Sequence, residues 1–200
     1  NYRSKRKQPY FVLTEPLPDM VTDDIKKIAL NYEETDGAVG GLIGVRGPNV
    51  NTEVRRVKQR WLPINFEETK KIHNLCMEIF EEANRRCFGV NIDKVFEMFY
   101  GEYHAADKGF YREHKDASLG SSGEVYDRKL SMTIQLSDPD EYEGGDFVFY
   151  DSSFDHPDKE LLRQKGTAFV FPSILLHGIQ PVTKGVRKCL VAFIEGPAWQ

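Results

Sequence analysis

The chain has 200 residues, of which 40% are hydrophobic and 29% are charged, and its formal net charge is −4. This length and composition predict one domain with a well-buried core. No apolar run approaches the roughly 20 residues of a membrane span, and a mildly acidic balance does not favour nucleic acid, so we expect neither partner.

The first half of the chain shows the apolar spacing of helices. Apolar residues at 21–32 recur every three or four positions after Pro18, which predicts an amphipathic helix. A longer apolar stripe at 72–83 predicts a second helix that ends near Gly89. Four basic residues precede the first helix at positions 3–7, and we interpret them as a solvated terminus.

A glycine-rich stretch at 37–47 separates the two predicted helices, and polar sequence follows it up to residue 61. Glycines can act as hinges, and the cationic and aromatic side chains of this segment are suited to gripping an extended peptide. Those side chains are Arg46, Arg55, Arg56 and Trp61. We interpret residues 37–61 as a lid, and an exposed charged loop is the alternative.

From residue 94 the sequence changes to short runs rich in β-branched and aromatic residues, at 95–103, 130–136, 147–150, 167–171 and 188–194. Gly, Asp, Ser and Pro clusters separate the runs, which is typical of a β-sandwich or barrel. Helices followed by strands predict an α+β fold with helices on one face of an antiparallel sheet. We expect a single domain over 1–200, with a helical and lid portion at about 10–93 and a barrel core at about 94–196.

Three cysteines, Cys76, Cys87 and Cys189, have no spacing that suits a zinc site. The first two fall in the second predicted helix and the third in an apolar strand, so we expect all three to be small core residues. Unpaired thiols, together with no recognisable secretory leader, favour a cytoplasmic location.

Two of the five histidines begin a His-x-Asp triplet, namely His114 with Asp116 and His156 with Asp158. The second triplet lies in a polar stretch at 151–158 with the composition of an exposed turn, so we interpret it as a surface feature. The first follows a strand-like run and precedes a Gly/Ser turn at 120–123. Alternation along a strand places His114 and Asp116 on one face, two residues apart.

A third ligand must come from a distant strand, and His177 follows the apolar run at 167–171. Sixty residues lie between Asp116 and His177, which leaves room for intervening strands. Two imidazoles and one carboxylate form the facial triad of non-haem Fe(II) oxygenases. Zinc is the alternative for the same ligands, although it usually closes to four ligands with a single water.

Arg187 lies ten residues after His177, at the start of a predicted strand. Alternation along that strand puts Arg187, Cys189, Val191 and Phe193 on one face. If this face lines the barrel interior, the guanidinium needs an anion there, and a dicarboxylate ligand supplies two oxygens for a forked bond. This favours iron over zinc. The alternatives are that Arg187 faces outward or that it pairs with a protein carboxylate.

Four motifs follow one another in a fixed order. They are the first His-x-Asp triplet, the Gly-Gly pair that closes the stretch 130–146, Phe-Pro-Ser at 171–173 followed by His177, and Pro-Val-Thr-Lys-Gly-Val-Arg at 181–187. This set resembles the prolyl 4-hydroxylase-like branch of the 2-oxoglutarate oxygenases, above all its PKHD-type hydroxylases, over about residues 95–195. The resemblance implies a double-stranded β-helix, a jelly-roll or cupin-like barrel, with supporting N-terminal helices.

The resemblance also implies an Fe(II)- and 2-oxoglutarate-dependent hydroxylase that consumes O2, with ascorbate as a further candidate cofactor. The metal would be held by His114, Asp116 and His177, which would thus be the catalytic residues. The implied reaction is hydroxylation of a prolyl residue in a peptide or protein, with release of succinate and CO2. The expected partner is therefore a polypeptide substrate.

Further side chains around the metal acquire roles from the same resemblance. The far carboxylate of 2-oxoglutarate would meet Arg187. The side chains expected to border the rest of the co-substrate are Tyr103, Thr133 and Gln135. Those expected to face the substrate are Tyr111, Trp61, Arg55 and Phe193. Several relatives have aromatic residues, one of them a tryptophan, where this chain has Glu113 and Phe193, and these departures bear on substrate choice.

Two other function classes stay open on these residues. One is a hydroxylase of a free amino acid or another small molecule, which would differ only in the pocket and the lid. The other is a non-catalytic barrel module whose three ligands hold a structural metal. A structural site needs no buried anion receptor, so Arg187 argues against the second class. The sequence does not predict an oligomeric state.

Overall fold

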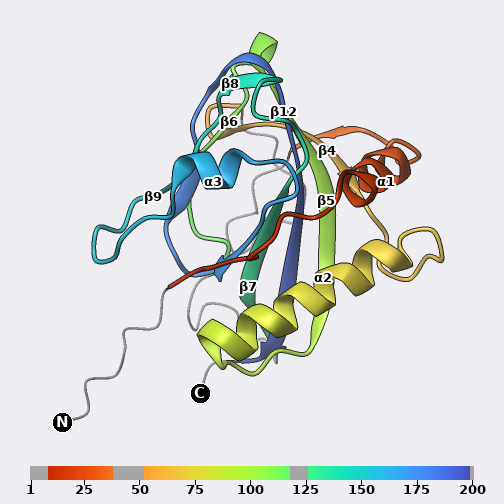
Figure 1. Ribbon diagram of the computed structural model, residues 1–200, viewed down its shortest axis with the longest axis vertical. Coiled ribbons are helices and arrows are strands. Elements are labelled where there is room, and N and C mark those ends of the chain that lie inside the picture. Colours follow the sequence, from red (N-terminus) through yellow and green to blue (C-terminus); the bar gives the residue numbers. More distant parts are fainter. Residues whose placement is uncertain (1–8, 38–51, 118–125, 199–200) are drawn as a thin grey trace.

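The computed structural model describes residues 9–37, 52–117 and 126–198, which form an α+β fold (Figure 1). The helices are α1 (Asp19–Ala29), α2 (Lys70–Ala83) and α3 (Lys159–Arg163), with the π-helix η1 (Asn84–Phe88) and the 3-10 helix η2 (Ala105–Asp107). The strands are β1 (Phe11–Val12), β2 (Thr35–Asp36), β3 (Arg55–Arg56), β4 (Lys58–Trp61), β5 (Lys94–His104), β6 (Phe110–His114), β7 (Tyr126–Gln135), β8 (Tyr142–Gly144), β9 (Phe147–Phe149), β10 (Ala168–Pro172), β11 (His177–Ile179) and β12 (Val182–Pro197).

The strands form two antiparallel sheets. The large sheet has the order β1-β10-β7-β12-β5-β4-β2, with β8 paired to β12, and the small sheet has the order β3-β6-β11-β9. The long strand β12 lies between β5 and β7, so that Val191 pairs with Phe99 on one side and with Thr133 on the other. Strands distant in sequence thus become neighbours. This is the predicted double-stranded β-helix in its jelly-roll form.

The central strands separate a helix-covered face from a cavity-lining face. On β12, the side chains of Leu190, Ala192 and Ile194 are fully buried in the main core. The alternate residues line a large cavity, and they are Arg187, Cys189, Val191 and Phe193. The two-residue period of a strand produces this division, so the predicted common face of these four residues is confirmed.

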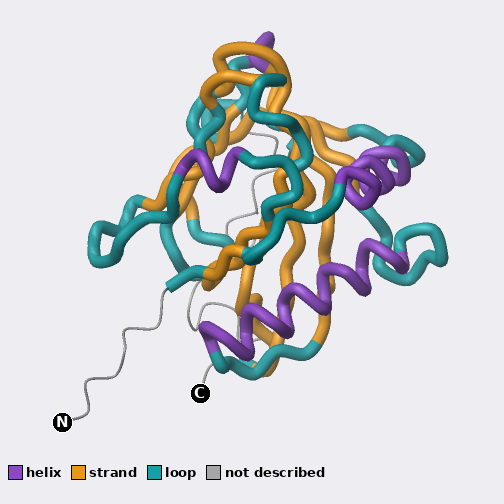
Figure 2. Tube along the Cα trace, in the orientation of Figure 1, coloured by secondary structure: helices purple, strands orange, loops and turns teal. Residues whose placement is uncertain are grey.

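Helices α1 and α2 pack on the outer face of the large sheet, and Figures 1 and 2 show α2 crossing in front of its central strands. Both helices bury apolar residues three or four positions apart, which are Ile25 and Ala29 of α1 and Ile72, Cys76, Ile79, Phe80 and Ala83 of α2. Helix α2 continues into η1, and Gly89 ends it with a left-handed φ of 64°. The two predicted helices are therefore confirmed.

Cys76 and Cys189 are buried free thiols, as expected, and Cys87 is half-buried. Burial raises the pKa of Cys76 to about 12, which makes this thiol unreactive at neutral pH. Among the described helices, none is long and apolar enough to cross a membrane.

The predicted lid is only partly described. Residues 38–51, with Arg46, lie outside the described residues, as do the basic terminus at 3–7 and the predicted Gly/Ser turn at 120–123. In the described part the expectation of a loop is wrong, because β3 pairs with β6 and β4 pairs with β5. Strand β4 escaped prediction because its sequence Lys-Gln-Arg-Trp is polar on both faces: Gln59 is buried, and Arg60 pairs with Glu34.

Candidate functional site

The three predicted metal ligands converge where strands β6 and β11 meet. His114 ends β6, His177 begins β11, and the two residues are opposite each other in the antiparallel pair. His114 Nε2 lies 3.3 Å from Asp116 Oδ1, and His177 Nε2 lies 3.4 Å from Asp116 Oδ2. One ligand atom from each residue lies within 4.8 Å of the others, so the three residues could hold one metal ion.

The hydrogen bonds of both imidazoles show that this cluster suits a cation. Nδ1 of His114 lies 2.8 Å from the carbonyl oxygen of Arg112, and Nδ1 of His177 lies 2.8 Å from that of Leu175. A carbonyl oxygen only accepts, so each Nδ1 donates its hydrogen and each ring can offer the lone pair of Nε2 to a metal ion. Burial lowers the pKa of His177, which keeps this ring neutral. Two lone pairs and a carboxylate thus face one another, and a divalent cation stabilises such a set.

Two serines that sequence reasoning did not assign hold Asp116 in place. Ser131 Oγ donates to Asp116 Oδ2 at 2.6 Å, and the Ser131 and Ser173 hydroxyls lie 2.8 Å apart. The backbone N–H of Asp116 also donates to the Ser173 carbonyl at 2.8 Å. Burial alone would raise the pKa of Asp116, but His177, His114 and the Ser131 hydroxyl hold it below its usual range. The alternation along β7 was the available signal for Ser131.

A stack of side chains flanks the ligand His114. The Tyr111 ring lies 3.4 Å from the His114 ring at an interplanar angle of 15°. The Arg55 guanidinium lies 4.4 Å from the centre of the Tyr111 ring, because β3 and β6 place these two residues opposite each other. The stack restricts rotation of the imidazole. Tyr111 therefore contacts the metal ligand His114, and Arg55 contacts Tyr111. A role of either residue in substrate binding stays a prediction.

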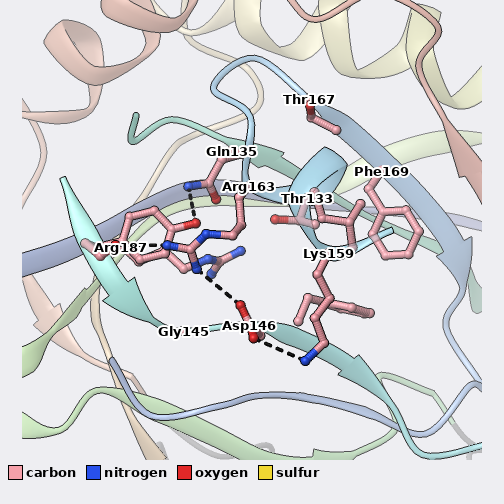
Figure 3. A pocket seen from close by; sticks show the side chains of 12 residues that line it. Thr133, Gln135, Gly145, Asp146, Lys159, Arg163, Thr167, Phe169 and Arg187 are labelled. Atoms are coloured by element: carbon pink, nitrogen blue, oxygen red, sulfur yellow. Dashed lines mark hydrogen bonds and ion pairs between the residues drawn. The ribbon is translucent and has the colours of Figure 1, made fainter. Parts of the chain in front are cut away.

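A cavity of about 450 Å³ opens beside the metal ligands. Its wall contains seven of the residues predicted for the co-substrate and the substrate, which are Tyr103, Thr133, Arg187, Tyr111, Trp61, Arg55 and Phe193. Gln135 lies outside this wall. It lines an adjoining cavity of about 20 Å³ that shares Thr133, Phe147 and Arg187 with the large one (Figure 3).

The second His-x-Asp triplet lies in a different place, as predicted. His156 is exposed, and its Nε2 lies 2.6 Å from the carbonyl oxygen of Asp151. Asp158 caps helix α3, because its carboxylate accepts the backbone N–H of Glu160 at 2.9 Å. Neither residue belongs to the metal-ligand cluster found among the described residues.

Arg187 is buried in the wall of the cavity, with 4% of its surface exposed. Its Nη1 donates a hydrogen bond to Cys189 Sγ at 3.9 Å, and its guanidinium lies 5.6 Å from the centre of the Tyr103 ring and interacts electrostatically with the Tyr142 hydroxyl. Within the described part of the chain, no carboxylate forms an ion pair with Arg187. Both alternatives, an outward side chain and a protein carboxylate partner, are therefore wrong for the described residues. A buried guanidinium without a carboxylate is suited to an anionic ligand.

Tyr142 and Arg163 support Arg187, although sequence reasoning assigned neither. Gln135 Nε2 donates to the Tyr142 hydroxyl at 3.1 Å, and the Arg163 guanidinium lies 4.2 Å from the centre of the Tyr142 ring. Arg163 also donates to the Gly144 carbonyl at 2.8 Å. It pairs with Asp146 at 3.2 Å (Figure 3). Helix α3 is thereby joined to the turn that follows Tyr142.

The Gly-Gly pair of the motif lies beside Arg187. Gly145 has a φ of 66°, which L-residues with a side chain rarely adopt. A Cβ at this position would lie 2.8 Å from Val182 Cγ2 and 3.1 Å from Arg187 Cδ. The absence of a side chain therefore leaves room for the arginine.

Comparisons with known proteins agree with this geometry. The family model of the 2OG-Fe(II) oxygenase superfamily matches residues 98–195, a range that contains the three metal ligands and Arg187. The PKHD-type hydroxylase of Nitrosomonas europaea is 28% identical over 185 residues, which cover 90% of this chain and 77% of that protein. Those of Polaromonas sp. and Azoarcus sp. are 26% and 35% identical over 74% and 51% of this chain, which spans only 65% and 44% of their lengths.

Solved structures share the fold. The viral collagen prolyl hydroxylase of Paramecium Bursaria Chlorella virus-1, in its 2OG complex, has a TM-score of 0.64 at 20% identity, with 94% of this chain and 97% of that chain covered. A prolyl hydroxylase from Trichoplax adhaerens, in complex with a hypoxia inducible factor peptide fragment, has a TM-score of 0.70 at 14% identity, with 94% and 83% covered. The site and the family match together show that the chain belongs to the 2OG-Fe(II) oxygenase superfamily, as a 2-oxoglutarate-dependent dioxygenase of the PKHD type.

Proposed function

We propose that this dioxygenase hydroxylates a prolyl residue of a polypeptide while it converts 2-oxoglutarate to succinate and CO2. One observation carries the proposal: a metal-ligand triad and a buried arginine without a described carboxylate partner share the wall of one cavity. The likeness to prolyl hydroxylases, one of them solved with a peptide fragment, supports a prolyl substrate.

Each side chain of the site has a task in this reaction. Fe(II) on His114, Asp116 and His177 would supply the activation of O2. Arg187 would bind the far carboxylate of 2-oxoglutarate through its forked donors, and Thr133 would border the same ligand. The aromatic walls would keep water from the reacting groups.

Hydroxylation of a free amino acid is the second candidate, and one observation favours it. The described part of the predicted lid is bound into both sheets, so these residues are not free to close over a long peptide. A cavity of about 450 Å³ could enclose a single amino acid together with the co-substrate.

The test is turnover with matched substrates. The protein is incubated with Fe(II), 2-oxoglutarate and pairs of peptides that differ only by Pro→Ala, with free proline and free lysine alongside. We expect succinate to form in proportion to a mass gain of one oxygen atom on the proline peptides alone. The variant His114→Ala should produce neither, because it removes a metal ligand.

Two results would decide against the proposal. Succinate formation with hydroxylation of a free amino acid and of no peptide would move the protein to the small-molecule class. Equal turnover of the Pro and Ala peptides would show that the polypeptide is hydroxylated at another residue.

A further inference from the structure

One end of the large cavity has no role in the proposed reaction. The cavity-facing row of β12 runs from Arg187 to Phe193, and the two ends are about 20 Å of extended strand apart. At the Phe193 end, the Arg128 guanidinium lies 3.8 Å from the centre of the phenylalanine ring, which is 6% exposed. A substrate that enters here therefore meets Arg128 and not the face of the phenylalanine ring.

Arg128 is held in position but keeps donors available. Its Nη2 donates to Glu97 Oε2 at 2.8 Å, and both side chains line the cavity while remaining partly exposed. Across the described residues, this is the only carboxylate that Arg128 contacts, and its Nε and Nη1 donate to no protein atom. The Phe96 ring also lies 5.2 Å from this guanidinium. A guanidinium fixed by two rings and one carboxylate is preorganised to bind a second carboxylate with its remaining donors.

The charge of the cavity favours an anion at this end. The charged residues in its described wall are Arg55, Lys115, Arg128 and Arg187, against Glu97 and Asp116. Fe(II) and the 2-oxoglutarate dianion cancel each other's charge, and so do Asp116 and Arg187. The residues that remain carry an excess of two positive charges. A cleft with low-dielectric walls concentrates the resulting potential on whatever enters it.

We infer that the substrate carries a carboxylate close to the hydroxylated residue and that Arg128 binds this carboxylate. The inference rests on the proposed function and names its substrate class, an acidic polypeptide segment. Arg128 lies three residues, or about 10 Å, before Ser131, whose hydroxyl holds the metal ligand Asp116. An extended peptide advances about 3.3–3.6 Å per residue, so the acidic residue should lie within about three residues of the proline.

The experiment uses matched pairs of substrates that differ by one charge. Proline peptides carry Glu or Gln at each position up to about three residues on either side of the proline. Free proline and prolinamide form a further pair, because a free α-carboxylate is the other source of the same anion. We expect kcat/KM from succinate release to be about fivefold or more higher for the best acidic peptide than for its amide partner.

Variants assign this preference to Arg128. Arg128→Gln should reduce the acid-to-amide ratio to about one, Arg128→Lys should keep part of it, and Glu97→Gln should raise it because a competing carboxylate is removed. Arg85→Gln is the control: it removes the same charge from a 2.5 Å pair with Glu82 on the helix surface and should keep the wild-type ratio.

The outcomes separate this inference from the proposed function. A wild-type ratio near one, or a ratio that survives in Arg128→Gln, overturns the role of Arg128. The protein could also turn over no peptide and prefer proline to prolinamide, with this preference lost in Arg128→Gln. That result would support carboxylate binding by Arg128 and would overturn the proposal of a polypeptide substrate. An increased ratio in Glu97→Gln supports the inference even if Arg128→Gln folds poorly.

Discussion

Two hydroxyls lie behind the metal-binding carboxylate, and single side chains of this kind decide how firmly the metal is held. Ser131 donates to Asp116, and its own oxygen is within hydrogen-bond distance of the Ser173 hydroxyl. Groups that orient metal ligands in this way typically contribute about 10- to 100-fold to metal affinity.

Ser131→Ala should therefore weaken metal binding by about 10-fold or more. The loss leaves one carboxylate oxygen of Asp116 without its donor, so the ligand becomes free to rotate. Titration with Mn²⁺, which occupies such oxygen and nitrogen sites without reacting with O2, measures the affinity. Ser173→Ala should have a smaller effect because Ser173 acts through Ser131. Unchanged affinity in Ser131→Ala would show that the backbone holds Asp116 sufficiently.

Arg187→Ala should weaken the binding of 2-oxoglutarate far more than the binding of the metal. Truncating one member of a buried, charge-assisted pair costs about 2–5 kcal/mol, or about 30-fold or more in affinity. Arg187→Lys should recover part of this affinity because it keeps the charge but loses the fork. Calorimetry with 2-oxoglutarate and with Mn²⁺ separates the two effects, and an equal loss of both ligands would mean that Arg187 is structural.

The residues of the site differ in how far the sequence could predict them. His114, Asp116 and His177 are recognisable from motif and spacing. Strand alternation groups Arg187 with Cys189, Val191 and Phe193 on one face, but it does not decide that this face lines the cavity. Ser131 and Tyr142 act through contacts between strands that are distant in the sequence. Such contacts depend on register and on side-chain direction, which one sequence does not contain.

Among the elements, the short helix α3 lies beside the site and is joined to it by Asp146. Both Lys159 and Arg163 pair with this carboxylate, at 3.3 and 3.2 Å (Figure 3). Only Arg163 also stacks on Tyr142, whose hydroxyl interacts electrostatically with Arg187. Lys159 and Arg163 therefore differ in their contact with Tyr142, and substitution of each residue tests what this contact contributes.

Arg163→Ala should weaken the binding of 2-oxoglutarate by roughly fivefold. The variant loses a cation–π contact of about 1 kcal/mol, which loosens the tyrosine beside Arg187. Metal affinity should not change. Lys159→Ala is the matched control, since it removes an exposed partner of the same Asp146 and leaves the tyrosine untouched. If both variants weaken the binding of 2-oxoglutarate equally, the ion pairs with Asp146 contribute to its affinity and the stacking on Tyr142 does not.

The elements also show where sequence patterns succeed. Helices α1 and α2 have long apolar stripes, and β12 has a long alternating run, so periodicity identifies all three. Helix α3 has five residues and β4 has four, which is too short for a period to be read. Strand β4 forms because β5 offers it a hydrogen-bonding edge, and its own composition gives no indication of this.

At the scale of the whole molecule, a metal at this site would join β6 to β11 and thereby stabilise the small sheet. Both imidazole Nε2 atoms lie within 3.4 Å of the Asp116 carboxylate, so one cation can bind all three ligands at once. The folded chain alone offers these ligands in one place, so metal binding should raise the free energy of unfolding.

Addition of Mn²⁺ at about 100 times its Kd should raise the stability by about 2.7 kcal/mol, or the Tm by about 5–10 °C for a chain of this length. Differential scanning fluorimetry with and without a chelator measures the shift. Asp116→Asn should lose most of it, because the charged ligand is replaced by a neutral one. An equal shift in Asp116→Asn would place the stabilising ion at another site.

Strand β12 carries both Arg187 and Phe193, so one continuous stretch of backbone determines the separation between the two ends of the cavity. An inserted or deleted residue between them would turn one end toward the helices and leave the other in place. The pairings of β12 shift register at Val182 and Lys184, before the cavity-facing row, and next to Phe193, at Ile194 and Glu195, beyond it. New substrate preferences should therefore arise by exchange of side chains or by changes in the surrounding loops, while the length of this stretch stays constant.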